Sequence, residues 1–212
     1  VMQKCYSPDF THYKQSLRVV EKLENNGEGL NLTWEVRDGI VNHSGENKAS
    51  TLEGVIIKFA DRIAYINHDI DDAVRGNVIK EDDIPRELSE VLGYTHSNRI
   101  NTMVTSVIEG SRELDDIKMT PEVWDATNKL RNFLFERVYY NSSAKKEERK
   151  AVEMLRQLFG YFCKHPEKMP EFYYNNTKNE SVERCVCDYV AGMTDRYAIE
   201  MYKDLFIPHV WE

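Results

Sequence analysis

The sequence predicts an all-α fold, and three observations support this. Apolar residues recur every three or four positions over most of the 212 residues, which is the period of an amphipathic helix. Residues that favour helix starts and ends, chiefly Ser, Thr, Asp, Pro and Gly, separate these stretches. No stretch shows the alternation of apolar and polar residues that is typical of a strand. We therefore expect a multi-helix bundle that forms one structural unit.

Two helices are predicted near the start of the chain. Ser7 and Pro8 have the residue types of a helix cap and a first turn, and the apolar face that follows extends to Gly27. Asn31 is a candidate cap for the second helix, which ends near His43. Polar residues and glycines on either side of the second helix predict loops.

The longest helix is predicted from Ser50 to Gly76. Ser50 with Glu53 three residues later forms a capping box, and Gly76 is expected to end the helix. Six residues form a single apolar stripe that we expect to be buried: Leu52, Ile56, Phe59, Ile63, Ile66 and Ile70. The opposite face of this helix is polar and carries Lys58, Asp61, Tyr65, Asp69 and Asp72.

Two interpretations of this polar face remain open. It is the solvated side of an amphipathic helix, or it is a ligand site. Four-residue spacing places the Asp61 carboxylate, the Tyr65 phenol and the Asp69 carboxylate in one line. Such a line suits a metal ion together with a hydroxylated, phosphorylated ligand.

The remaining elements are also predicted to be helical. Helices are expected at residues 83–93, 100–108 and 120–140, and in a segment that runs to Phe162 before Pro166. Residues 166–179 are predicted to be a connection. A last helix is expected to start at Ser181 and to continue through Gly192 to Tyr197, and the many aromatic residues of this third are predicted to be structural.

Composition narrows the class of protein. The net charge is -8 and the basic residues form no cluster, which argues against nucleic acid as a ligand. No apolar run approaches the roughly 18 to 20 residues of a membrane span, so a cytoplasmic protein without a membrane partner is expected. The four cysteines lack the spacing of a disulfide framework or a zinc site, which predicts reduced thiols.

Several blocks of the chain resemble a known family. Bacterial deoxyguanosinetriphosphate triphosphohydrolase-like proteins, of the HD-domain superfamily, are similar to this sequence at residues 10–20, 29–43, 52–73, 97–109 and 187–198. The resemblance implies the C-terminal part of an HD-type catalytic core at residues 1–110, with a helical region packed on it at residues 111–212. It also implies hydrolysis of dGTP or another dNTP to a deoxynucleoside and tripolyphosphate, with a divalent metal such as Mg or Mn.

The same resemblance implies roles for five residues. Asp61 matches a metal ligand, and Arg62 matches the position of a cation that meets the triphosphate. Tyr65 matches an aromatic residue beside the sugar, and Asp69 matches a carboxylate that accepts the 3'-hydroxyl. His12 matches a histidine near the α-phosphate, where it is a candidate catalytic residue that positions water or the leaving oxygen.

The chain departs from the family pattern in its metal ligands. The family's other ligands, a His and a His-Asp pair, lie upstream of the block that contains His12, and only eleven residues precede His12 here. The chain has one His-Asp pair, His68-Asp69, and this pair lies downstream of Asp61. We therefore expect a C-terminal part of the enzyme that holds metal poorly, is inactive alone and exposes the polar face of its longest helix. Its expected partners are a dNTP, the missing N-terminal segment and, at full length, further copies of itself.

Two other functions are consistent with the same residues. One is the hydrolysis of a different nucleotide by a member of the HD superfamily. The other is a helical module without catalysis that binds nucleotides or a protein partner.

Overall fold

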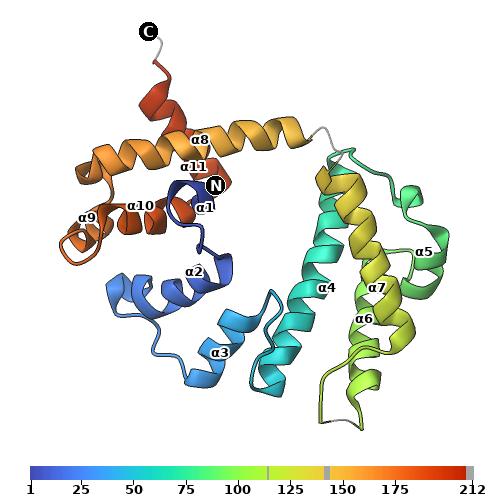
Figure 1. Ribbon diagram of the computed structural model, residues 1–212. Coiled ribbons are helices and arrows are strands. Elements are labelled where there is room, and N and C mark those ends of the chain that lie inside the picture. Colours follow the sequence, from blue (N-terminus) through green and yellow to red (C-terminus); the bar gives the residue numbers. More distant parts are fainter. Residues whose placement is uncertain (114, 141–143, 209–212) are drawn as a thin grey trace. The chain divides into compact units, whose positions relative to one another are not determined.

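The computed structural model describes residues 1–113, 115–140 and 144–208, and it describes the side chains of helix α8 from residue 147 onwards. Eleven α-helices and no strand are present in this part of the chain, which confirms the all-α prediction (Figure 1). The chain divides into two compact units, Val1–Leu30 with Lys146–Glu212 and Asn31–Lys145. Each unit has its own hydrophobic core.

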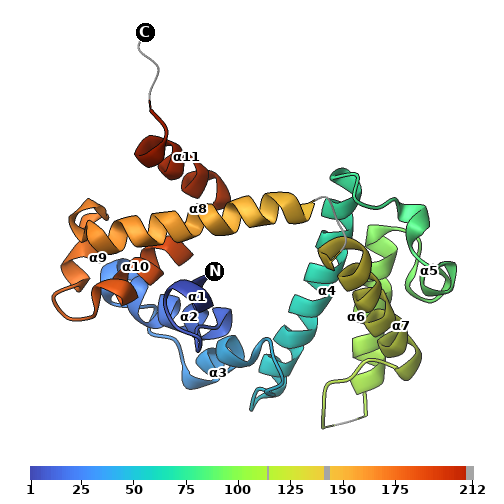
Figure 2. The same cartoon turned by 45° about the horizontal axis from the view of Figure 1, so that its top comes forward.

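The unit Asn31–Lys145 is built around α4. Its helices are α3 (Trp34–Asn42), α4 (Leu52–Arg75), α5 (Arg86–Leu92), α6 (His96–Ser111) and α7 (Pro121–Leu134), and a π-helical segment (Phe135–Tyr140) follows α7 directly. In both ribbon views α4, α6 and α7 lie side by side (Figures 1 and 2). The fully buried side chains of these three helices include Ile66, Ile70, Met103 and Leu130, and Leu92 of α5 belongs to the same core.

The start of α4 lies one residue after the predicted one, whereas its end is as predicted, since the helix stops at Arg75 and Gly76 is the C-cap. The cap is Thr51, whose hydroxyl accepts a hydrogen bond from the Gly54 N–H at 3.2 Å. Ser50 lies one residue before the cap, and its own N–H donates to the Asp38 carboxylate at 2.6 Å. At the other end Gly76 has a φ of -76°, and the left-handed residue is Asn77 with a φ of 53°.

Only the second half of the predicted apolar stripe is buried. Ile66 and Ile70 are fully buried, whereas Leu52 and Ile56 are 45% and 44% exposed. The prediction that the whole stripe is buried is therefore wrong for the first turns of α4. There Ile56 lines an apolar groove between α4 and α6 in place of a closed core.

The unit Val1–Leu30 with Lys146–Glu212 contains the other six helices. They are α1 (Met2–Cys5), α2 (His12–Arg18), α8 (Ala144–Lys164), α9 (Glu171–Asn176), α10 (Val182–Ala191) and α11 (Asp195–Phe206). A π-helical segment (Val19–Leu23) extends α2. The core of this unit is formed mainly by α8 and α10, with Leu158, Phe162, Val186 and Cys187 fully buried.

Two of the predicted helix starts near the beginning of the chain are wrong. The Ser7 hydroxyl accepts from the Asp9 N–H at 3.2 Å and closes a local turn, so α2 begins only after Thr11. Asn31 has a φ of 50°, which is left-handed, and α3 begins after Thr33.

Two predictions near the end of the chain are also wrong. The predicted last helix is two helices, because α10 ends at Ala191 and the Thr194 hydroxyl caps α11 by accepting from the Tyr197 N–H at 3.2 Å. The predicted connection at residues 166–179 contains the short helix α9. None of the described helices is both long and apolar enough to cross a membrane.

Candidate functional site

Four of the five predicted site residues lie on α4 between Asp61 and Asp69. Asp61 is exposed, whereas Arg62, Tyr65 and Asp69 are half-buried. The prediction that the polar face of α4 is exposed holds for Asp61 and is wrong for Tyr65 and Asp69. These two side chains are covered because α7 and the segment after it pack along this side of α4.

Two residues of α7 and its π-helical extension bind the polar face of α4. Arg131 Nε donates a hydrogen bond to the Tyr65 hydroxyl oxygen at 3.0 Å. Tyr139 donates its hydroxyl hydrogen to Asp69 Oδ2. The Arg131 guanidinium also lies over the Phe135 ring, 4.8 Å from its centroid, which fixes its direction. Arg131 and Tyr139 therefore belong to the same cluster as Tyr65 and Asp69.

Arg62 is held by an aromatic ring and by no carboxylate. Its guanidinium lies 4.8 Å from the centroid of the Trp124 ring on α7, and Trp124 in turn packs edge-on against Phe59. Within the described part of the chain, neither Arg62 nor Arg131 takes part in a salt bridge. Stacking on rings holds both charges in place while leaving them available to an anion.

The electrostatics keep Tyr139 a hydrogen-bond donor. Burial raises the pKa of the Tyr139 phenol, and its hydrogen bond to Asp69 and the charge of that carboxylate raise it further.

Lys58 lies one turn before Arg62 on α4. Burial and the charge of Arg62 lower the pKa of Lys58. Lys58 donates to the carbonyl oxygens of Gly45 and Asn47, each at 2.7 Å, and so ties α4 to the preceding loop.

Asp61 stands without the further ligands that a divalent ion needs. In the residues described here, no group of three or more His, Cys, Asp or Glu side chains is arranged to hold a metal ion. Useful sites for hard divalent ions need several oxygen or imidazole ligands in fixed geometry. The donor set of these residues alone therefore does not fit a divalent metal.

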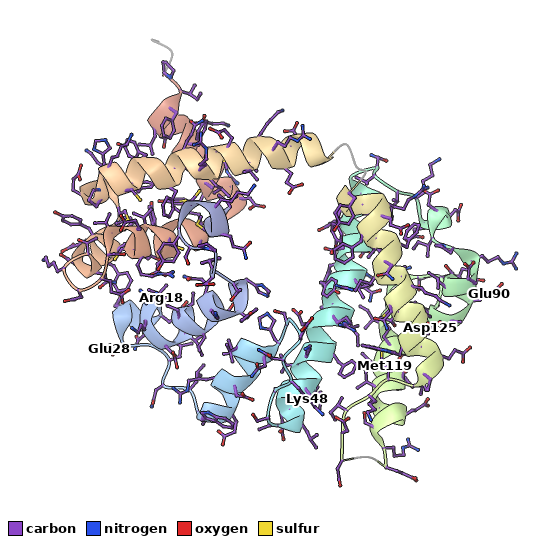
Figure 3. The ribbon with its side chains drawn as sticks, in the orientation of Figure 1. Arg18, Glu28, Lys48, Glu90, Met119 and Asp125 are labelled. Carbon is purple, nitrogen blue, oxygen red and sulfur yellow. The ribbon has the colours of Figure 1, made fainter. Side chains whose placement is uncertain are left out.

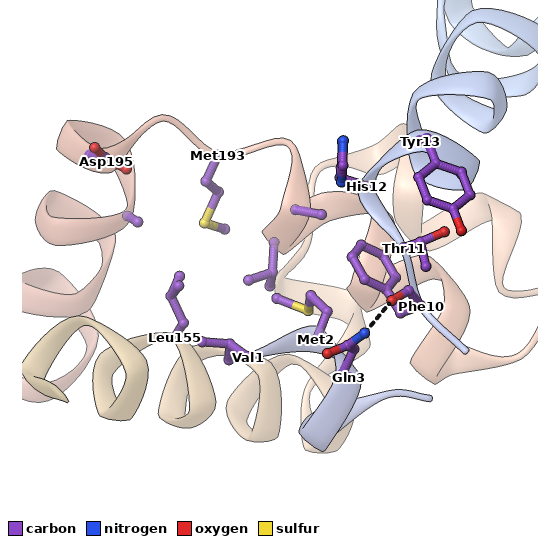
Figure 4. Close-up of a pocket in the computed structure, with 13 residues that line it drawn as sticks. Val1, Met2, Gln3, Phe10, Thr11, His12, Tyr13, Leu155, Met193 and Asp195 are labelled. Carbon is purple, nitrogen blue, oxygen red and sulfur yellow. Dashed lines mark hydrogen bonds between the residues drawn. The ribbon is translucent and has the colours of Figure 1, made fainter. Parts of the chain in front are cut away.

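His12 lies in the other compact unit, at the first position of α2. It lines an open, mainly apolar pocket of about 520 Å³. Figure 4 shows Thr11, His12 and Tyr13 on one side of this pocket and Met193 and Asp195 on the other. The structure thus joins Tyr65 to Arg131 and Asp69 to Tyr139, stacks Arg62 on Trp124, and places His12 beside the turn between α10 and α11.

Sequence reasoning missed Arg131, Tyr139 and Trp124. All three lie in the helix predicted at residues 120–140, to which no functional role was given. A usable signal was present, because Arg131, Phe135 and Tyr139 follow one another at four-residue spacing, as Asp61, Tyr65 and Asp69 do on α4. The helix α7 and the segment after it therefore carry the same four-residue spacing as the predicted site on α4.

Comparison with known proteins first shows which kind of domain part of the chain resembles. The family described as the phosphohydrolase-associated domain matches residues 117–204, which include α7 to α10 and most of α11. This part of the chain is therefore similar to a domain described as associated with phosphohydrolases.

Individual relatives define the family more closely. A deoxyguanosinetriphosphate triphosphohydrolase-like protein of Caldanaerobacter subterraneus is 51% identical over 211 residues, covering 100% of this chain and 62% of the relative. Proteins of the same description from Clostridium tetani and Clostridium perfringens are 41% and 42% identical, covering 99% and 94% of this chain and 63% and 61% of their own lengths. The chain is similar to deoxyguanosinetriphosphate triphosphohydrolase-like proteins over almost its whole length and spans less than two thirds of the length of these relatives. The resemblance seen in the sequence is thereby confirmed.

Proposed function

We propose that the chain is part of a metal-dependent phosphohydrolase that converts dGTP or another dNTP into a deoxynucleoside and tripolyphosphate. The observation that carries the proposal is the cluster on α4 and α7. It combines two arginines that are stacked on rings with a tyrosine pair and a carboxylate. This combination suits a ligand that is strongly anionic at one end and carries a hydroxyl group at the other.

In this proposal the two arginines bind the triphosphate. The planar, charged guanidinium groups of Arg62 and Arg131 suit phosphate oxygens. Tyr65 lies beside the sugar, and its hydroxyl is already oriented by Arg131 at 3.0 Å. Binding of the triphosphate and placement of the sugar are thus linked through one arginine.

Asp69 is proposed to accept the 3'-hydroxyl of the deoxyribose. An ionised carboxylate can only accept hydrogen bonds, and its two oxygens offer several acceptor positions. Tyr139 occupies Oδ2, which leaves Oδ1 for the sugar. Tyr139 then fixes the direction of the carboxylate as the sugar binds.

His12 is proposed to position water or to transfer a proton to the leaving oxygen. An imidazole is suited to this role because it can donate or accept a proton near neutral pH. His12 lies at the edge of a pocket that an approaching ligand can enter.

Metal binding is proposed to depend on polypeptide that the relatives contain and this chain does not match. Asp61 supplies one ligand, and the His and His-Asp of the family pattern would supply the others. When bound, the ion would polarise a phosphoryl oxygen. We propose that the 212-residue chain alone is inactive, that the complete protein acts in the cytoplasm as a homo-oligomer, and that residues 1–110 and 111–212 correspond to its catalytic core and associated region.

The decisive test is release of tripolyphosphate from dGTP in the presence of Mn²⁺. The chain is compared with a version extended upstream through the His and His-Asp. Activity in the extended version alone supports the proposal, and activity in the shorter chain refutes the ligand assignment. If both are inactive with dGTP, product analysis with other nucleotides separates a different HD hydrolase from a module that only binds.

A further inference from the structure

A buried carboxylate on α10 is bound by side chains of α2. Asp188 is 2% exposed and lies in the block at residues 187–198, to which the proposed function gives no role. From α2, Gln15 Nε2 donates to Asp188 Oδ1 at 2.7 Å, and Arg18 donates through Nε at 3.0 and 2.9 Å and through Nη2 at 2.7 Å. Arg18 lies between α2 and α10 (Figure 3). A single carboxylate therefore binds both polar side chains on this face of α2.

The charges around Asp188 are balanced. Arg184 donates to Asp188 Oδ1 at 2.5 Å from the preceding turn of α10, and Glu180 forms a second ion pair with Arg18. Burial alone would lower the pKa of Arg18, but hydrogen bonds with Asp188 and Glu180 outweigh burial and raise it. The Arg184 guanidinium also lies 4.7 Å from the centroid of the Tyr6 ring. Arg18 and Arg184 thus face two carboxylates in an arrangement that satisfies the buried Asp188.

The helix α2 is held by polar contacts more than by burial. None of its seven side chains is fully buried, and the Thr11 cap makes no side-chain hydrogen bond to the helix. Asp188 is the centre of this network, because it accepts from both Gln15 and Arg18 of α2, while Arg184 donates to Gln15 and Arg18 donates to Glu180. These bonds fix the position and rotation of α2. His12 is three residues before Gln15, so both lie on neighbouring parts of the helix surface.

We propose that Asp188 is a positioning residue for His12. By holding Gln15 and Arg18, it sets the rotation of α2 and therefore the direction in which His12 points at the pocket. The inference rests on the proposed role of His12. It gives the phosphohydrolase-associated region, which contains Asp188, a task in catalysis without direct contact with the substrate.

The first test is a double-mutant cycle in the protein extended through the family's metal ligands. We expect Asp188→Asn to lower kcat about 10- to 100-fold with little change in KM, within the roughly 10²- to 10⁴-fold that a general acid or base contributes. In a His12→Gln background the same substitution should have almost no further effect, because Asp188 acts through His12. Equal losses in both backgrounds would overturn the proposal. Glu153→Gln, which breaks an exposed ion pair with Arg156 in the same unit, is the matched control and should leave kcat unchanged.

The second test needs no activity and uses the 212-residue chain. With labelled histidines, the ring signal that disappears in His12→Gln identifies His12 by NMR. Arg18→Lys keeps the charge but loses the forked contact with Asp188, and it should shift this signal, as should a folded Asp188→Asn. An unmoved His12 signal in folded Arg18→Lys would overturn the positioning role even if Asp188→Asn does not fold.

The two tests separate this inference from the proposed function. If His12→Gln leaves kcat of the extended protein unchanged, the catalytic role of His12 fails. The NMR comparison still decides whether Asp188 fixes the His12 side chain.

Discussion

Removing one hydroxyl group from Tyr139 tests the cluster on α4 directly. Tyr139→Phe deletes the donor to Asp69 and leaves the ring in place. A hydrogen bond to a charged group contributes roughly 1.5 to 3 kcal/mol. Because Asp69 and Tyr139 are both only half-buried, water replaces part of the lost bond. We therefore expect the free energy of unfolding at pH 7 to fall by about 1 kcal/mol.

The pH dependence of this loss provides a second check. The pKa of Tyr139 is raised in the folded chain, so its contribution to stability is fully present below the phenol's unfolded pKa of about 10 and is lost as pH rises above it. The gap in unfolding free energy between wild type and Tyr139→Phe should accordingly narrow from pH 7 to pH 11. Other tyrosines titrate equally in both chains and cancel in the difference.

The assay is urea unfolding followed by tryptophan fluorescence. Two of the three tryptophans, Trp34 and Trp124, lie in the same compact unit as Tyr139, so with Trp211→Phe in every chain compared the signal comes from that unit. Tyr94→Phe is the control, because Tyr94 is 58% exposed in the same unit, and it should change stability by less than about 0.5 kcal/mol. Equal stability of wild type and Tyr139→Phe at pH 7, with no change at pH 11, would show that the Tyr139 to Asp69 bond does not stabilise the fold.

Three further outcomes are expected. Ile66→Ala should lower the free energy of unfolding by about 2 to 5 kcal/mol, because Ile66 is fully buried. Ile57→Ala, at a position that is 53% exposed, should lower it far less, and a similar loss for both would contradict the assigned core. Thr51→Ala should destabilise α4 by about 1 kcal/mol and Ser50→Ala much less, because the Thr51 side chain caps the helix. If thermal unfolding shows the reverse order, Ser50 is the cap, as the sequence predicted. The thiol of Cys187 should react with a thiol reagent at pH 8 only after urea is added, because burial raises its pKa to about 11 and the side chain is inaccessible. Rapid labelling of Cys187 in the folded chain would refute this.

The sequence was sufficient for the fold class and for the existence of most helices. The apolar period of α4 is strong because it repeats over many turns, and Ile66 and Ile70 are buried as the pattern requires. Helix ends were predicted less well. Both Ser50 and Thr51 are good caps, and only the tertiary contact of Ser50 with Asp38 decides between them.

The candidate site was likewise only partly predictable from the sequence. The line of Asp61, Tyr65 and Asp69 follows from helix geometry, so the sequence alone predicts it. Their contacts with Arg131 and Tyr139 join residues about seventy positions apart, and no local pattern encodes such a pairing. The role of Asp188 was equally hidden, because Gln15 and Arg18 lie more than 160 positions before it.

The match to the phosphohydrolase-associated domain begins inside one core and ends inside another. Residue 117 precedes α7, whose Leu130 and Leu134 are buried together with Ile66 and Ile70 of α4. The rest of the match, from α8 onwards, belongs to the other compact unit. The residues that match the family, 117–204, therefore do not form one compact unit of the structure. A fragment cut at residue 117 would separate α7 from the α4 side chains that bury it, and should lose the structure of that helix even though the shared sequence is intact.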